Sequence, residues 1–140
     1  MGMSYQETYS ECKWNVIQLL STYKSYVEQN DLNNLYKTKA ILVAEKAILN
    51  QIYADSNGLY LDKKSEYSDK KDELYLAYCE TETNGIADRR SRLDSTGLRG
   101  EMNTLLTKRN KAQKMIEDVK DVIIEIAVIL KDKRNEETYG

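Results

Sequence analysis

Apolar residues recur every three or four positions along most of this chain, which is the spacing of a helix with one apolar face. The first such stripe predicts a helix over residues 5–29. Its members are Tyr9, Cys12, Val16, Leu19, Tyr23 and Tyr26. The 140 residues include six glycines and no proline, so little in the composition opposes helix formation. We therefore predict an all-α protein.

Turn residues divide the middle of the chain. Asp31 can cap a second helix over residues 32–55, because its carboxylate can accept from backbone amides of the first turn. The dipeptide Asn57-Gly58 predicts a left-handed stop after that helix. The second helix is apolar over a broad arc that includes Val43 and Ile48, so we expect it to pack against more than one neighbour.

A third helix is predicted over residues 62–82, where a thin apolar stripe lies among many charges. We expect this helix to be peripheral and solvated, with its end marked by Asn84-Gly85. A short helical or irregular piece follows, and Ser95 or Thr96 can cap the next helix.

The last helix is predicted from about Leu98 to Asn135, where apolar residues alternate by four and three as in a coiled coil. From 122 to 130 the apolar surface widens beyond that seam, so other helices should enclose it, from this chain or from other copies. We predict one domain over residues 1–140, an oligomeric helical hairpin or coiled-coil bundle. The candidate oligomer interface is Leu105, Ala112, Ile116, Val119, Ile123, Ile126 and Leu130.

One charged residue, Arg109, occupies the seam of this last helix. A charge at such a position costs stability unless the side chain finds a partner or reaches solvent. It can set the register or the number of subunits, or mark the place where the seam opens to water. The sequence leaves both interpretations open.

The residues used by most enzymes are missing. The chain has no His, which removes the commonest metal ligand and the usual base of nucleophilic triads. No glycine pattern for nucleotide phosphates occurs, and the carboxylates lie among lysines on polar helical faces. We expect no catalytic activity, no metal and no cofactor.

Neither the cysteines nor the hydropathy pattern points to an extracellular or membrane protein. Cys12 and Cys79 are isolated and form no CxxC pair, so we expect reduced thiols. The longest apolar run, 122–130, is too short to span a bilayer and contains Glu125. The sequence therefore predicts a soluble, cytoplasmic protein that does not enter membranes.

Charge is unevenly distributed. The net charge is −2, yet residues 86–114 hold eight basic and three acidic side chains, a net charge of +5. We call residues 86–114 the basic segment. Such a segment can follow the phosphates of a nucleic acid, and the guanidinium fork of Arg suits phosphate oxygens. The candidate nucleic-acid-binding residues are Arg89, Arg90, Arg92, Arg99, Lys108, Lys111 and Lys114.

The alternative is that the basic segment docks on the chain's own acidic helix, 62–82, where four lysines face seven acidic residues. The eleven tyrosines, with no Phe, allow two interpretations as well. They are ordinary core residues with surface hydroxyls, or aromatic platforms on which bases stack.

The C-terminal half resembles a known family. The run IADRRSRLDSTGLRGEMNTLLTKRNKAQKMIEDVKDVIIEIAVILKDKRNEE combines a polar middle, a long helix with regular apolar spacing and an LK-x-x-R ending at 130–134. It is similar to small helical phage recombination accessory proteins, particularly the UvsY-type recombination mediators. The resemblance covers about fifty residues. It implies a ring-forming protein without enzymatic activity that binds single-stranded DNA and helps load a strand-exchange recombinase.

Two functions from different classes are therefore expected. The first is a single-strand-binding recombination accessory protein in which residues 89–114 contact phosphates, tyrosines elsewhere in the chain offer stacking surfaces and residues 116–130 assemble the subunits. The second is a small acidic interaction module, a phage-encoded inhibitor or adaptor, that presents residues 62–82 to a basic partner protein. The net charge of −7 outside the basic segment favours the second.

Overall fold

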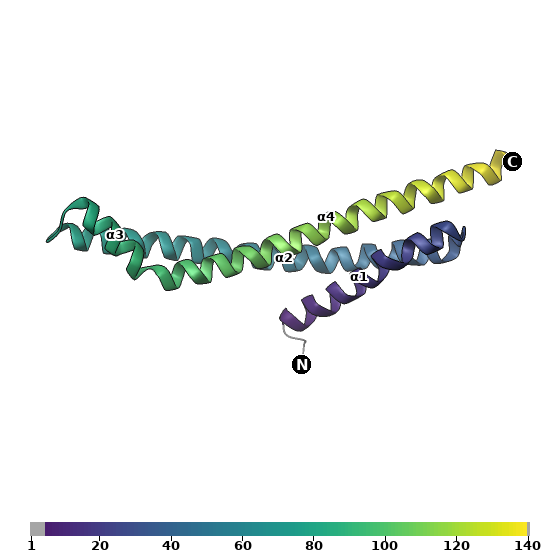
Figure 1. Ribbon diagram of the computed structural model, residues 1–140. Helices are drawn as coiled ribbons and strands as arrows, with labels where there is room; N and C mark the ends of the chain where they lie inside the picture. Colours follow the sequence, from purple (N-terminus) through teal and green to yellow (C-terminus); the bar gives the residue numbers. More distant parts are fainter. Residues whose placement is uncertain (1–4, 140) are drawn as a thin grey trace. The chain divides into compact units, whose positions relative to one another are not determined.

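The computed structural model describes residues 5–139, and the side chains of residues 8–136. This part of the chain forms four helices and no strand: α1 (Tyr5–Glu28), α2 (Leu32–Cys79), α3 (Asn84–Asp94) and α4 (Thr96–Tyr139), shown in Figure 1. The all-α prediction is confirmed. None of the described helices is long and apolar enough to cross a membrane.

Contacts divide the chain into two compact units, where the sequence predicts one domain. Unit 1 consists of residues 1–52 and 111–140, and unit 2 consists of residues 53–110. Helices α2 and α4 each contribute one part to unit 1 and another part to unit 2. We describe each unit by itself.

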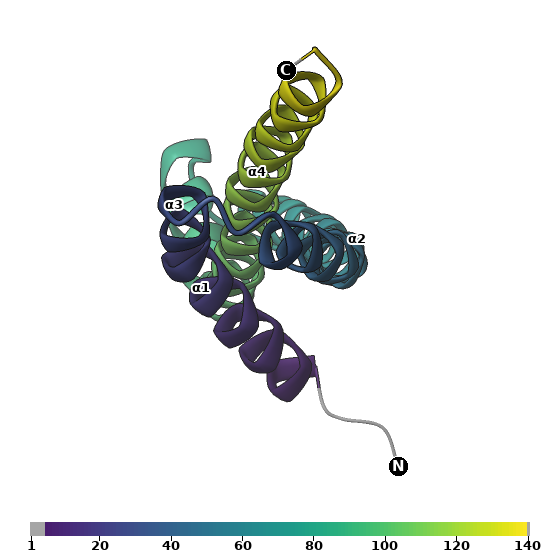
Figure 2. The ribbon, with the colours of Figure 1, turned by 90° about the vertical axis from the view of Figure 1, so that its right-hand side faces the viewer.

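Unit 1 packs α1, the first part of α2 and the last part of α4 around one apolar core (Figures 1 and 2). On α4 burial follows the heptad spacing that the sequence predicts, since Val119 and Ile126 are fully buried. The fully buried leucines of α2 are also seven residues apart: Leu35, Leu42 and Leu49. Helix α1 begins and ends within one residue of its predicted bounds. Its buried side chains are Cys12, Val16 and Tyr23.

The buried stripe of α2 differs from the apolar arc that the sequence predicts. Between its leucines the stripe contains Thr38 and Glu45, which are buried polar residues. Val43 and Ile48, members of the predicted arc, are exposed instead. The three- and four-residue spacing therefore decides burial on this helix, because side chains off that stripe face away from the neighbouring helices.

The turn between α1 and α2 forms as the sequence predicts. The backbone amide of Asn34 donates to Asp31 Oδ1 at 3.2 Å, which caps the first turn of α2. Asn30 has a φ of 55°, in the left-handed region that Asn tolerates better than most residues. These two residues reverse the chain between α1 and α2.

The predicted stop at Asn57-Gly58 is wrong, because α2 continues through it as one 48-residue helix and Gly58 has no positive φ. A glycine inside a helix costs only about 1 kcal/mol relative to Ala. Tertiary contacts outweigh that cost, since Ser56 is fully buried and Arg109 donates to the Asn57 side chain. The predicted helices 32–55 and 62–82 are thus parts of α2.

We expect Gly58→Ala to stabilise the protein by about 1 kcal/mol, because a helical Gly loses more backbone entropy on folding than Ala. An added Cβ at position 58 meets nothing within 4 Å. Urea unfolding followed by circular dichroism measures the change. Ala54→Gly, one turn earlier on the same helix, should lower stability by a similar amount. A loss of stability in Gly58→Ala would instead indicate the left-handed stop.

One more predicted boundary and one predicted cap are wrong. Asn84-Gly85 begins α3 instead of ending the preceding helix, which ends at Cys79. Neither Ser95 nor Thr96 uses its hydroxyl as predicted to cap α4. The Ser95 hydroxyl donates to the Ser91 carbonyl at 2.7 Å, and that of Thr96 donates to the Leu93 carbonyl at 2.7 Å. Both hydroxyls thus bind carbonyls at the end of α3, where the last carbonyl groups lack helical partners.

Candidate nucleic-acid interface

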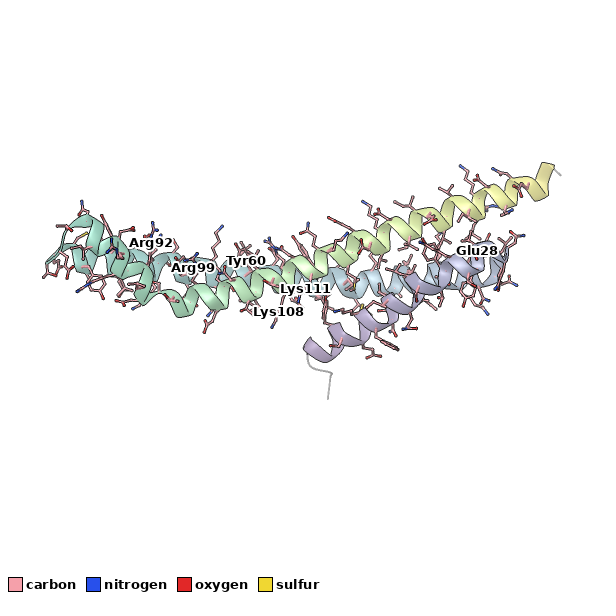
Figure 3. All side chains as sticks on the ribbon, viewed as in Figure 1. Glu28, Tyr60, Arg92, Arg99, Lys108 and Lys111 are labelled. Atoms are coloured by element: carbon pink, nitrogen blue, oxygen red, sulfur yellow. The ribbon has the colours of Figure 1, made fainter. Side chains whose placement is uncertain are left out.

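The predicted nucleic-acid-binding residues lie on two helices. Arg89, Arg90 and Arg92 are exposed on α3, and Arg99 and the half-buried Lys108 lie on the first part of α4. These five belong to unit 2. Figure 3 labels Arg92, Arg99 and Lys108. The remaining two are exposed in unit 1 and lie farther along α4: Lys111 and Lys114.

The ion pairs of the described side chains show whether the basic segment docks on the chain's own acidic stretch, residues 62–82. Arg90 Nη1 lies 2.7 Å from Glu82 Oε1, and this pair does join the two. Arg92 pairs within α3, with Asp88 at 3.2 Å, and Lys114 pairs within α4, with Asp118 at 2.9 Å. One predicted residue of the seven therefore contacts residues 62–82 through an ion pair among the described side chains.

Four of the predicted residues form no ion pair with another described side chain: Arg89, Arg99, Lys108 and Lys111. The acidic stretch instead uses its own lysines. Lys63 Nζ lies 3.0 Å from Glu66 and 3.1 Å from Glu101 of α4. Hydrogen bonds to Glu66 and Glu101 raise the pKa of Lys63. This second bridge between the two segments is thus the reverse of the predicted arrangement, with the cation on α2 and the acid on α4.

The basic side chains of α4 that form no ion pair do not all lie along one side of the helix. Arg99 and Lys108 are nine residues apart, which is about two and a half helical turns, so they flank the buried stripe on opposite sides. The sequence prediction treats the basic segment as one surface. In the structure these side chains instead line two opposite edges of α4, and a flexible DNA strand can follow either edge.

Cations already cover faces of several tyrosines in unit 2. The guanidinium carbon of Arg90 lies 5.7 Å from the ring centroid of Tyr78, and Lys71 Nζ lies 5.9 Å from that of Tyr67. The hydroxyl of Tyr78 also donates to Asp94, and this hydrogen bond raises the Tyr78 pKa. Such pairs leave at most one face of each ring for a stacked base.

Arg109 finds partners within unit 2. Its Nη1 donates to Asn57 Oδ1 at 3.1 Å, its Nε and Nη2 donate to Asn110 Oδ1, and its guanidinium carbon lies 4.9 Å from the Tyr60 ring centroid. The guanidinium therefore joins α2 and α4 inside the predicted seam. This arrangement supports the interpretation that Arg109 sets the register between these two helices.

We expect Arg109→Ala and Asn57→Ala to show a coupling energy of about 0.5–1.5 kcal/mol in a double-mutant cycle, the usual net value of one hydrogen bond. Urea unfolding of the two single variants and the double variant measures it. Arg99→Ala combined with Asn57→Ala is the matched control, because Arg99 forms no hydrogen bond with Asn57, and it should show no coupling. Additive single effects for Arg109 and Asn57 would contradict the register role.

The predicted oligomer interface is largely used inside the chain. Ala112, Val119, Ile126 and Leu130 are buried, and α1 and α2 supply the core around the last three. Leu105, Ile116 and Ile123 are half-buried. A second copy would therefore meet the flanking residues of α4. Ile124 and Val128, which lie off the predicted seam, remain exposed there.

A polar site that the sequence pattern did not single out lies between α1 and α2. Glu45 is buried in the core stripe, and its Oε1 accepts from Asn15 Nδ2 at 3.1 Å, while its Oε2 has no described partner. The Cys12 thiol donates to the Glu45 carbonyl at 3.6 Å. Burial and the nearby carboxylate raise the pKa of Cys12 to about 12.

The described residues contain no group of three or more Cys, Asp or Glu side chains placed to hold a metal ion. Comparison with protein-family models, with curated proteins and with solved structures found no match. The similarity to UvsY-type mediators therefore stays a prediction.

Proposed function

We propose that this protein is a non-enzymatic, oligomeric accessory protein that binds single-stranded DNA in the manner of a recombination mediator. The observation that supports it most is the set of four basic side chains, Arg89, Arg99, Lys108 and Lys111, that no described carboxylate neutralises. Unpaired Arg and Lys attract phosphates, and binding is strengthened by release of the counterions that surround the strand. A recombinase partner follows from the family resemblance alone.

The test is the salt dependence of binding to a fluorescent, unstructured oligonucleotide, followed by anisotropy. We expect affinity to fall steeply between low and physiological salt. Replacing Arg89, Arg99 and Lys108 together by Ala should reduce the slope of log affinity against log salt by about 0.7 for each of these residues that contacts a phosphate of the strand. No binding at micromolar protein, or an unchanged slope, would contradict the proposal.

A matched control removes three exposed lysines outside the basic segment, Lys13, Lys24 and Lys37, which have no described ion pair. It changes the net charge by the same amount and should leave the slope unchanged. The single variants Arg99→Ala and Lys108→Ala then decide which edge of α4 carries the strand. The residue on that edge should account for the larger loss of affinity.

The acidic interaction module is kept as the second candidate because of one exposed side chain. Leu76, on α2, is 67 % exposed, and Asp69, Asp72 and Glu73 lie seven, four and three residues before it on the same face. An apolar anchor among carboxylates suits a basic protein with an apolar pocket. Capture of one discrete protein that is lost in Leu76→Glu, with no DNA binding, would favour this function.

A further inference from the structure

The outward face of α1 carries two large apolar residues among polar ones. Trp14, the only tryptophan of the chain, is 63 % exposed, and Ile17, three residues later on the same face, is 46 % exposed. The inward face of α1 is occupied by Cys12 and Val16, which are buried against the core of unit 1. Ser10 and Ser21, one turn before Trp14 and one turn after Ile17, are small enough to let another helix approach closely.

A groove of matching character lies between the other two helices of unit 1. Its volume is about 380 Å³, and no residue of α1 lines it. The walls are Val43 and Ala47 of α2 and Ile123 and Ile124 of α4, and Lys46 and Lys120 lie beside them. Val43 and Ile124 are both more than half exposed. The groove is thus the place where a three-helix packing would accept a fourth helix.

We propose that this groove receives α1 of a second copy of the chain, with Trp14 entering between α2 and α4. A chain cannot fill its own groove in this way, because Trp14 points away from the core that α1 shares with α2 and α4. A large indole can bury about 150–250 Å². This inference rests on the proposal that the protein is oligomeric, and it identifies the side chains that join one copy to the next.

Charge favours a second copy as the occupant. Glu11 is exposed one turn before Trp14 and forms no ion pair with another described side chain. Lys46 and Lys120 line the groove and likewise have none. Docking would place the Glu11 carboxylate near these ammonium groups, and lysines beside an indole can add a cation–π contact. The chain therefore carries both halves of a complementary contact on different faces.

The contact should occur at least twice in each assembly. Helix α1 has 24 residues, a length of about 36 Å at 1.5 Å per residue, and a stable interface buries about 800 Å² on each partner. One helix face in one groove covers less than that. A reciprocal pair, or a ring closed by the same contact, provides the additional area.

The first experiment measures the mass in solution of the full chain and of two variants that change exposed side chains only. Trp14→Ser removes the inserted residue, and Ile124→Glu puts a charge into the groove. We expect both to fall to the mass of one chain with unchanged helicity. Leu76→Glu, which changes an equally exposed apolar residue of unit 2, is the matched control and should keep the assembled mass.

The second experiment mixes the two disrupted variants. Ile124→Glu retains Trp14 but has a damaged groove, whereas Trp14→Ser retains the groove and contains no tryptophan. Adding Trp14→Ser in excess to Ile124→Glu, at concentrations well above those at which the parent chain assembles, should shift the tryptophan emission to shorter wavelength. The mixed pair retains one intact contact, in which the indole of one chain leaves water for the groove of the other. All emission comes from the Ile124→Glu copy, so the shift reports this contact directly.

The inference is overturned if either variant keeps the assembled mass, or if mixing leaves the emission unchanged. A tryptophan shift that appears only with single-stranded DNA would place Trp14 on the nucleic-acid surface and would overturn it too. DNA binding is measured in parallel by the salt slope. If the single-chain variants still bind DNA, the proposed DNA binding stands without the Trp14 contact. If the assembled parent chain does not bind DNA, the proposed function is rejected and the Trp14 contact stands.

Discussion

Replacing Ile126 by Asp is expected to unfold unit 1. The Ile126 side chain is fully buried in the core formed by α1, α2 and α4. Truncating a buried Ile costs about 2–5 kcal/mol, and an unpaired buried carboxylate adds several more. The free energy of unfolding of a whole domain is about 5–15 kcal/mol, so the expected loss is of comparable size. Circular dichroism and the urea unfolding midpoint measure the loss.

The same helix offers the control. Ile124, two residues before Ile126, is 52 % exposed, so Ile124→Asp should leave the helicity and the free energy of unfolding within about 0.5 kcal/mol of the parent chain at concentrations where it is a single chain. Equal losses of stability in Ile124→Asp and Ile126→Asp would show that Ile124 does not lie on an exposed face of α4. A stable Ile126→Asp would contradict the core assignment.

The second large effect is expected at alkaline pH. In the folded chain burial raises the pKa of the Cys12 thiol to about 12, from 9.0 in an unfolded chain. Burial and the hydrogen bond to Glu125 raise the pKa of Tyr23 above its ordinary 10.0 as well. Both groups are neutral in the native state, so their full contribution to stability is present below pH 9 and is lost as the pH rises.

Between pH 9 and 12 the unfolded chain releases protons that the folded chain retains, and the free energy of unfolding falls. The Cys12 share is at most about 4 kcal/mol. Urea unfolding at a series of pH values measures it. Cys12→Ala should flatten the profile in this window. An unchanged profile in Cys12→Ala would contradict the burial of this thiol.

The helical class and the first helix follow from local sequence alone. The apolar stripe of α1, the Asp31 cap and the absence of proline agree with one another, and α1 ends within one residue of the predicted position. Such agreement is expected where propensity, capping and periodicity indicate the same structure. The buried stripe of α4 was predictable for the same reason, since Ala112, Val119 and Ile126 keep its period.

The candidate site was predictable in composition but not in geometry. The sequence shows which segment is basic, and its residues are mostly exposed. It does not show that Arg90 pairs with Glu82, or that Arg99 and Lys108 flank α4 on opposite sides. An ion pair forms only between side chains that the fold brings within 4 Å of one another. Predicting it therefore requires the positions of α2, α3 and α4 in unit 2.

By itself the sequence determined the helical class, the span of α1 and the seam of α4, because these depend on contacts within a few turns of one helix. The tertiary structure decided the rest. It carries α2 through Asn57-Gly58, places Glu45 in the core and surrounds the seam of α4 with the chain's own helices. Each outcome depends on burial and hydrogen bonds between distant segments, which outweigh a local cost of about 1 kcal/mol.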